Sequence, residues 1–343
     1  MPVERERMDR LEELRRYTSK SATGLEIAAY FNPIVPKAQG YQALILDVFD
    51  TETLHANARS DPNIPPDRIA EIEAVDIVAD ASGLGAAVEA LGLAGQFSYI
   101  VSSHNFEHLP DPIGFLRGCL VALRPGGTLT MAIPDLRACF DHFRMPSRLV
   151  DWLSAYHEGR NQPSAETQFD LAANRSTYVG SVGERGSCSI NRDDPANFRL
   201  QGNMRDAYAS YLATRTDAGP YRDAHCSTMF PETFALMVHD LVYLGLIDFE
   251  LTGVTETRGH EFFVHLRKPV SPASAPLSDD AYYTRREALL KAIDLNLGVN
   301  GFHTNSVLSH RMGRKLKDFL HRRVGAGTMR RLSAMNRSLR GRV

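Results

Sequence analysis

Residues 97–135 read FSYIVSSHNFEHLPDPIGFLRGCLVALRPGGTLTMAIPD, and this stretch decides the fold of the chain. Its apolar run 99–101 ends abruptly in the polar residues 102–104, as a buried parallel strand does where it reaches the rim of a sheet. The stretch therefore begins with a predicted buried strand that leads into a polar loop.

The same stretch continues with a helix and a second strand. Asp111 is a suitable N-terminal cap, and Pro112 after it suits the first helical position. Pro125-Gly126-Gly127 predicts that the helix ends in a turn, and the apolar run 129–133 predicts the next strand. These elements make a predicted βαβ unit whose polar ends lie on one side.

Three earlier apolar runs predict further strands, at 24–28, 42–46 and 75–78. The acids Asp47 and Asp80 follow the second and third of them. The carboxyl ends of the strands in a doubly wound sheet meet along one edge, where such folds bind ligands. The sequence therefore predicts an α/β fold with a binding site at that edge.

The chain after residue 145 is expected to complete one domain, 1–268. The insertion 146–229 is polar and predicts a lid or substrate wall above the sheet rim, with a helix near 203–213. The segment 230–267 predicts a buried helix followed by two strands that pair as an antiparallel hairpin.

Both ends of the chain are expected to be helical. Residues 4–18 predict a charged amphipathic helix that covers a sheet edge or rim. The composition of 269–278 indicates a linker, and 279–343 is expected to be a basic helical tail. Within it, 311–343 hold 11 Lys and Arg residues against the single acid Asp318.

This basic tail suggests an anionic membrane or an acidic protein partner. The sequence leaves open that the tail folds back on the acidic body of the same chain. Aromatic residues do not interleave with the basic ones, so there is no strong signal for nucleic acid.

The composition of the 343 residues, 43% hydrophobic and 23% charged, is ordinary for a globular protein. No apolar run is long enough to span a membrane, and the charged start, Glu4 to Arg7, does not suit a secretory signal. We therefore expect a cytoplasmic protein. This expectation includes peripheral attachment to the inner face of the membrane. The four cysteines show no paired spacing, which argues against a zinc knuckle or a disulfide framework.

In order and spacing, these segments resemble the class I S-adenosylmethionine-dependent methyltransferases, in particular a bacterial group with S-H-x-x-E-H and L-R-P-G-G motifs. The resemblance covers residues 20–145 and is carried by Leu25-Glu26-Ile27, Asn32-Pro33, Asp47, Asp80, Ser103-His104-Asn105-Phe106-Glu107-His108 and Leu123-Arg124-Pro125-Gly126-Gly127. It implies a Rossmann-like fold, with a mostly parallel seven-stranded sheet and an antiparallel C-terminal hairpin. It also implies S-adenosyl-L-methionine as cofactor.

The resemblance further implies a set of cofactor-binding residues: Glu26, Ala28, Asn32, Asp47, Asp80, Ser103 and His104. Asp47 would bind the two ribose hydroxyls, because one carboxylate can accept a hydrogen bond from each of them. Asp80 would hold the adenine amino group, and Glu26 would lie near the methionine portion. The alternatives are a helix cap near Thr51 for Asp47 and a turn residue for Asp80.

The chain departs from the family at Ala28 and Ala29, where the family usually has glycine. Glycine lets a backbone approach a nucleotide closely and adopt positive φ. Alanine adds a methyl group there, which is expected to weaken cofactor binding without abolishing it.

By the same resemblance, His104 lines the reacting centre and is the expected catalytic residue. Its ordinary pKa suits a general base toward an acceptor hydroxyl, although a loop histidine with a structural role is the alternative. The other candidates are expected to be structural: Glu107, His108, His157, Glu158 and His225.

The letters from His104 to His108 also fit H-x-x-E-H, a zinc-protease motif that needs both histidines on one face of a continuous helix. Here a strand precedes the motif, and Pro110 and Pro112 follow it. This context argues against the helix, so no metal site is predicted.

The predicted function is transfer of a methyl group from S-adenosylmethionine to an oxygen or nitrogen of a small-molecule or glycan acceptor. Acid–base help is not required, because displacement from a sulfonium depends mainly on positioning and desolvation. The alternative is a catalytically silent binding or scaffold protein whose cofactor pocket is spoiled at Ala28 and Ala29. A nicotinamide enzyme is disfavoured because no G-x-G-x-x-G follows the first strand.

Overall fold

A computed structural model describes residues 2–181, 183–216, 219–271 and 277–298. The chain divides into two compact units, Met1–Arg286 and Glu287–Val343, and the first unit contains the sheet. The predicted basic segment 311–343 lies outside the described residues.

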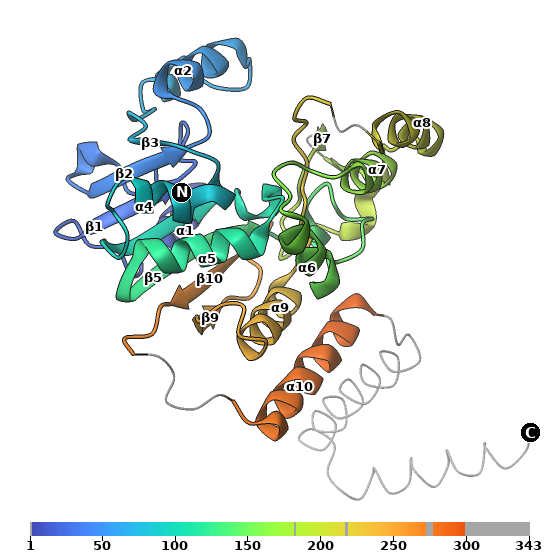
Figure 1. Ribbon diagram of the computed structural model, residues 1–343. Helices are drawn as coiled ribbons and strands as arrows, with labels where there is room; N and C mark the ends of the chain where they lie inside the picture. Colours follow the sequence, from blue (N-terminus) through green and yellow to red (C-terminus); the bar gives the residue numbers. More distant parts are fainter. Residues whose placement is uncertain (1, 182, 217–218, 272–276, 299–343) are drawn as a thin grey trace, which may run out of the picture. The chain divides into compact units, whose positions relative to one another are not determined.

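The first unit is built on a seven-stranded sheet in the order β3-β2-β1-β4-β5-β10-β9 (Figure 1). Its strands are β1 Thr23–Ile27, β2 Gln42–Asp47, β3 Ile77–Val78, β4 Phe97–Ser103, β5 Leu123–Pro134, β9 Glu250–Val254 and β10 Glu261–Arg267. The first five run parallel, while β10 is antiparallel to both β5 and β9. The predicted mostly parallel sheet with an antiparallel hairpin is confirmed.

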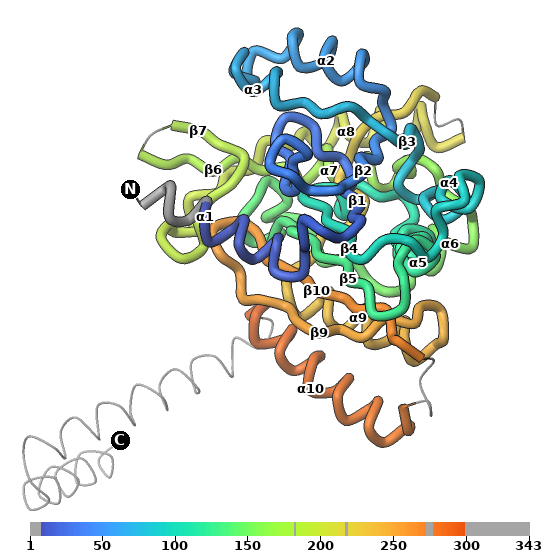
Figure 2. Tube along the Cα trace, turned by 90° about the vertical axis from the view of Figure 1, so that its left-hand side faces the viewer, coloured from blue at the N-terminus to red at the C-terminus, as the bar shows by residue number. Residues whose placement is uncertain are grey.

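Successive residues of the central strands pack on opposite faces of the sheet. Ile100 of β4 belongs to the larger core, under the helices α4 Leu84–Ala90, α5 Pro112–Ala122 and α9 Pro231–Tyr243. Val101 belongs to a smaller core on the other face, with Leu14 of the helix α1 Pro2–Leu14. Figure 2 shows α1 lying across this second face. The predicted N-terminal helix therefore covers the sheet.

Local sequence signals explain the connection between β4 and β5. The side chain of Asp111 accepts a hydrogen bond from the Gly114 amide at 2.9 Å, so the predicted cap of α5 is confirmed. A Cβ atom on Gly118 would lie 2.8 Å from the Gly85 backbone nitrogen, so glycine lets α5 approach α4 closely. The helix α5 ends at Ala122, before the predicted turn at 125–127, and β5 begins directly at Leu123. The pairing of β5 with β4 jumps from Leu123 to Thr128, and Gly126 between them has a left-handed φ of 77°.

The helix after β2, α2 Thr51–Ser60, is capped by Asp50, whose carboxylate accepts from the Thr53 amide at 2.8 Å. The alternative role of Asp47 as the helix cap near Thr51 is therefore wrong. The short helix α3 Pro66–Ile69 follows it.

The insertion contains helices and a small sheet of its own. Its helices are α6 Leu149–Glu158, α7 Ala165–Asn174 and α8 Met204–Thr214, and its strands are β6 Ser176–Gly180, β7 Gly183–Arg185 and β8 Phe198–Leu200. The strands pair antiparallel in the order β7-β6-β8. The sequence predicted α8 but not this sheet, whose strands are short and partly exposed.

The helix after the linker, α10 Asp279–Leu297, begins where the tail was expected to begin. Its first turns belong to the first unit, because the Tyr282 hydroxyl donates to Asp240 at 2.8 Å and Arg286 pairs with the same carboxylate at 3.1 Å.

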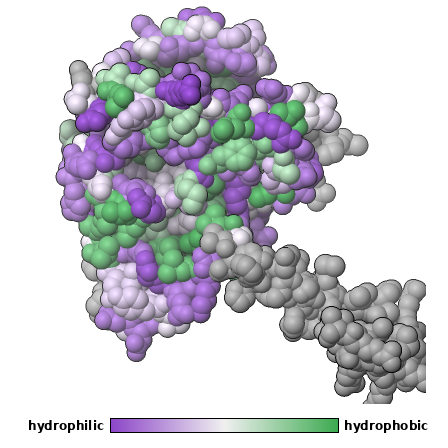
Figure 3. Space-filling view, turned by 90° about the vertical axis from the view of Figure 1, so that its right-hand side faces the viewer, coloured by the Kyte–Doolittle hydropathy of each residue, from purple (hydrophilic) through white to green (hydrophobic). Residues whose placement is uncertain are grey.

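None of the helices in the described part of the chain is long and apolar enough to cross a membrane. Figure 3 shows one face of the surface, where hydrophobic residues gather in separate groups between hydrophilic ones.

Candidate functional site

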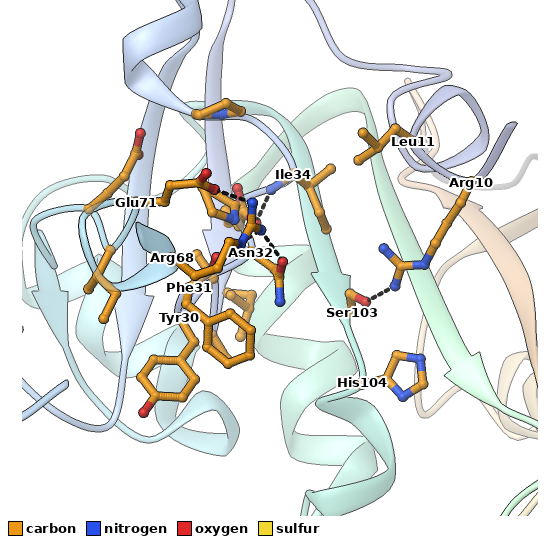
Figure 4. A pocket seen from close by; sticks show the side chains of 18 of the residues that line it. Arg10, Leu11, Tyr30, Phe31, Asn32, Ile34, Arg68, Glu71, Ser103 and His104 are labelled. Atoms are coloured by element: carbon orange, nitrogen blue, oxygen red, sulfur yellow. Dashed lines mark hydrogen bonds and ion pairs between the residues drawn. The ribbon is translucent and has the colours of Figure 1, made fainter. Parts of the chain in front are cut away.

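A cavity of about 880 Å³ lies at the carboxyl edge of the sheet, within the size range of small-molecule sites. Its walls come from α1, from the loop between β1 and β2, from residues 68–73, from the end of β4 and from the start of β10. Because β10 is antiparallel, its first residue, Glu261, pairs with Pro134 at the end of β5 and so reaches this edge. In Figure 4, Tyr30, Phe31 and Arg68 form one group of side chains, and Ser103 and His104 lie in a separate group.

Five of the seven predicted binding residues line the cavity: Glu26, Ala28, Asn32, Ser103 and His104. Asp47 and Asp80 do not. Asp47 is buried and accepts from the Phe49 amide at 3.0 Å, and burial raises the pKa of its carboxyl group. Asp80 is exposed and accepts from the Ser82 amide at 2.7 Å, as a turn residue does.

Glu26 shapes the cavity by holding the loop that follows β1. Its two carboxylate oxygens accept from the backbone amides of Ile34 and Val35, at 2.6 and 2.9 Å. Burial raises its pKa to about 7, although these two hydrogen bonds act in the opposite direction. The carboxylate thus has a structural task, which accounts for an acid inside an apolar strand.

Three residues of the cavity wall have a left-handed backbone although none is glycine. Their φ angles are 53° at Ala28, 44° at Tyr30 and 50° at His104. Such conformations are uncommon for residues with a Cβ atom and cluster at functional sites. Ala28 therefore occupies a position with the backbone that glycine adopts freely.

The mutation Ala28→Gly is expected to raise the free energy of unfolding by about 0.5–1 kcal/mol. The left-handed conformation costs alanine about 1–2 kcal/mol, and the greater freedom of unfolded glycine offsets part of the gain. Urea denaturation measures the change. Ala29 has no positive φ, so Ala29→Gly is the matched control and should lower stability. A loss of stability in Ala28→Gly would contradict the strain.

An ionic network that the sequence analysis did not predict closes one side of the cavity. Arg10 of α1 pairs with Glu261 at 2.6 Å and donates to the Ser103 hydroxyl at 2.6 Å. The other oxygen of Glu261 lies 2.8 Å from His104 Nε2. Burial alone would raise the pKa of Glu261, but His104 and Arg10 outweigh it and hold that pKa at about 2.

The same network changes the expectation for His104. Burial lowers its pKa. The hydrogen bond to Glu261 and the charges of Glu107 and Glu261 together raise the pKa by more than burial lowers it, so the net pKa is raised. The raised pKa favours the protonated ring, which donates hydrogen bonds and does not accept a proton. The arrangement therefore suits His104 for positioning better than for general-base catalysis.

Glu73 is a further acid at the cavity that the sequence analysis missed. One of its oxygens accepts from the Lys37 amide at 2.6 Å. The other, Oε2, is buried and has no hydrogen-bond partner among the described residues. Glu73 also lines the cavity, so an acceptor without a partner lies beside it. Glu261 opens the buried strand β10, so an acid at the start of a buried strand was a signal for that residue. Glu73 lies in the loop before β3 and has no such signal.

The remaining candidates lie outside the cavity. His157 and Glu158 are exposed at the end of α6. The motif from His104 to His108 does not form an α-helix, since Phe106–His108 is a single 3-10 turn. The structure thus lacks the helical context that the zinc-protease motif needs.

No protein-family model and no curated protein matches the chain. Among solved structures, a putative S-adenosylmethionine-dependent methyltransferase from Listeria monocytogenes is 12% identical, with 75% of this chain and 96% of that chain covered and a TM-score of 0.38. An S-adenosylmethionine-dependent methyltransferase from Mesorhizobium loti is 13% identical, with 75% and 97% covered and a TM-score of 0.37.

A third structure is the 1,6-didemethyltoxoflavin-N1-methyltransferase of Burkholderia thailandensis with bound 1,6-didemethyltoxoflavin and S-adenosylhomocysteine. It is 11% identical, with 77% of this chain and 78% of that chain covered and a TM-score of 0.36. At these values the likeness does not extend to activity, so any function has to be argued from the site.

Proposed function

We propose that the chain is a methyltransferase that moves a methyl group from S-adenosylmethionine to an oxygen or nitrogen of a small-molecule or glycan acceptor. The observation that carries the proposal is the cavity at the carboxyl edge of β1 and β4. Its wall contains left-handed backbone at Ala28 and His104, at the edge where doubly wound sheets bind nucleotides.

The cavity offers groups that fit the parts of this cofactor. Tyr30 and Phe31 pack edge to face, with ring centroids 5.0 Å apart, and aromatic faces suit adenine or a sulfonium cation. The free oxygen of Glu73 suits the ribose hydroxyls, because a carboxylate accepts hydrogen bonds from both. We assign this task to Glu73 in place of Asp47, whose side chain lies off the cavity.

The cofactor would supply an already activated methyl group when bound. The protein would then act by aligning the acceptor and excluding water. Ser103 and His104 are held rigidly by Arg10 and Glu261, so they are suited to orient an acceptor with hydrogen bonds.

Isothermal titration calorimetry with S-adenosylhomocysteine tests the proposal. We expect one site per chain with a micromolar dissociation constant. Glu73→Gln is expected to weaken binding about tenfold, which corresponds to about 1.4 kcal/mol for a lost charge-assisted hydrogen bond. Asp47→Asn is the comparison and should change the affinity little.

The two variants also separate the possible outcomes. A large effect of Asp47→Asn with none of Glu73→Gln would return the ribose to Asp47. No binding at millimolar ligand would reject the enzyme and favour the silent scaffold protein, for which the strained Ala28 is the supporting observation.

A further inference from the structure

A second cluster of ionisable side chains lies beside the cavity but is not part of its wall. It contains Glu107, His108 and His225, each with one potential metal-ligand atom, and these three atoms lie within 4.8 Å of one another. Glu107 Oε1 is 3.9 Å from His108 Nε2 and 3.6 Å from Nδ1 of His104, which lines the cavity. The three residues come from the loop after β4 and from the segment before α9.

Glu107 is the unusual member of this cluster. Its side chain is 1% exposed, and neither carboxylate oxygen has a hydrogen-bond partner among the described residues. A buried carboxylate without a hydrogen-bond partner is costly, and the imidazole nitrogens of His104 and His108, at 3.6 and 3.9 Å, are too far away to donate to it. Such a group requires an explanation, and a bound cation would supply one.

The two histidines are already oriented as metal ligands are. His108 Nδ1 lies 2.8 Å from Asp223, and His225 Nδ1 lies 2.5 Å from Asp141. A carboxylate that accepts from Nδ1–H fixes the tautomer in which Nε2 carries a free electron pair. Each ring thus has Nε2 left as its donor for the shared space.

The carboxylate behind His225 is itself held firmly. Asp141 pairs with Arg144 at 2.8 Å, and Arg144 donates to the His225 carbonyl at 3.0 Å. All three residues are buried. His225 is therefore clamped at its ring and at its backbone, as a preorganised ligand requires.

We propose that Glu107, His108 and His225 form a binding site for one divalent first-row transition metal ion, with Asp141 and Asp223 as outer partners. Two imidazole nitrogens and one carboxylate are a common donor set for zinc and for non-haem iron, and this set leaves at least one coordination position open. Donors of one zinc ion lie about 3–3.5 Å apart, so small side-chain movements would close the present spacing.

The proposal does not depend on methyl transfer. The sequence did not predict this site, because the H-x-x-E-H motif suggests His104 and His108 as the two metal ligands. The structure pairs His108 with His225 instead, from a segment far away in the sequence. The site thus differs from the zinc-protease arrangement in its second histidine and in the use of the glutamate as a ligand.

Titration of tag-free, chelator-treated full-length protein with ZnCl₂, followed by calorimetry, tests the site. We expect one ion per chain with a submicromolar dissociation constant. Glu107→Gln and His108→Gln should each weaken binding at least tenfold. His157→Gln removes an exposed histidine outside the cluster and should leave binding unchanged. Co²⁺ as a spectroscopic probe should show visible bands that both cluster variants lose.

Two further measurements make the result decisive. Circular dichroism in metal-free buffer should show the wild-type fold for Glu107→Gln, because glutamine keeps the shape and removes a buried charge. Zinc should raise the melting temperature of the wild type more than that of this variant. Absence of stoichiometric zinc binding, or equal binding by wild type and both cluster variants, would overturn the proposal.

Discussion

Glu261→Gln is expected to lower the free energy of unfolding by about 3 kcal/mol near pH 6. The carboxyl pKa is about 2 in the folded chain against an ordinary value of 4.5, and each unit corresponds to about 1.4 kcal/mol. The side chain is only 7% exposed, so solvent screens its contacts with Arg10 and His104 little. Glutamine would keep the shape and lose the charge that both partners need.

The loss should depend on pH in a defined direction. The depressed pKa of Glu261 means that its stabilisation is present above pH 4.5 and disappears as pH falls toward about 2. The raised pKa of His104 means that its stabilisation is present below pH 6.5 and is lost as pH rises through the folded value. The difference between wild type and variant should therefore be largest between pH 4.5 and 6.5.

Urea denaturation across this pH range measures the difference, and NMR titration of His104 should show a lower pKa in the variant. Glu250→Gln is the matched control, because Glu250 also pairs with an arginine, Arg267 at 3.5 Å, but is 55% exposed. Its loss should be about 0.5 kcal/mol or less. A pH-independent difference for Glu261→Gln would show that the ionic network does not stabilise the fold.

The sheet was predictable because its parallel strands are apolar runs, and polar residues end all of them except β1. That signal is local, and the hairpin of β9 and β10 is local as well. The small sheet of the insertion has no such signal: β7 is exposed along its whole length, so its pairing depends on contacts that no periodicity shows. Pro125-Gly126-Gly127 marks an irregular stretch of β5, where the pairing with β4 jumps from Leu123 to Thr128 and Gly126 has a left-handed φ of 77°.

The candidate site was predictable only as far as its residues follow their own strands. Glu26, Ala28 and His104 come directly from β1 and β4, and all three line the cavity. Arg10 and Glu261 come from opposite ends of the first unit, and the antiparallel course of β10 brings them together. A contact of this kind depends on the topology of the sheet. No local pattern in the sequence predicts it.

Asp141→Asn is expected to lower the free energy of unfolding by about 3 kcal/mol. Asp141 is buried between Arg144 and His225, and both contacts are short, at 2.8 and 2.5 Å. These partners hold its pKa below the ordinary value even though burial acts to raise it. Removing the charge would leave a buried guanidinium with less compensation, which costs about 3–5 kcal/mol when no partner remains.

Asp170 provides the matched control, because it pairs with the same arginine at 2.7 Å but is 40% exposed. Asp170→Asn should cost about 1 kcal/mol or less, since solvent replaces much of what the pair supplies. Thermal and urea denaturation in the presence of a chelator compare the two variants without any contribution from bound metal. Equal losses would show that burial does not strengthen the Asp141 pair.

A double variant separates the attraction of the pair from the cost of stranding its partner. In Asp141→Asn with Arg144→Met, no buried guanidinium is left, and the methionine fills most of the same volume. The double variant should therefore lose clearly less stability than the sum of its two single variants. If the losses simply add, Asp141 acts through His225 alone, and Arg144 is satisfied by Asp170 and the His225 carbonyl.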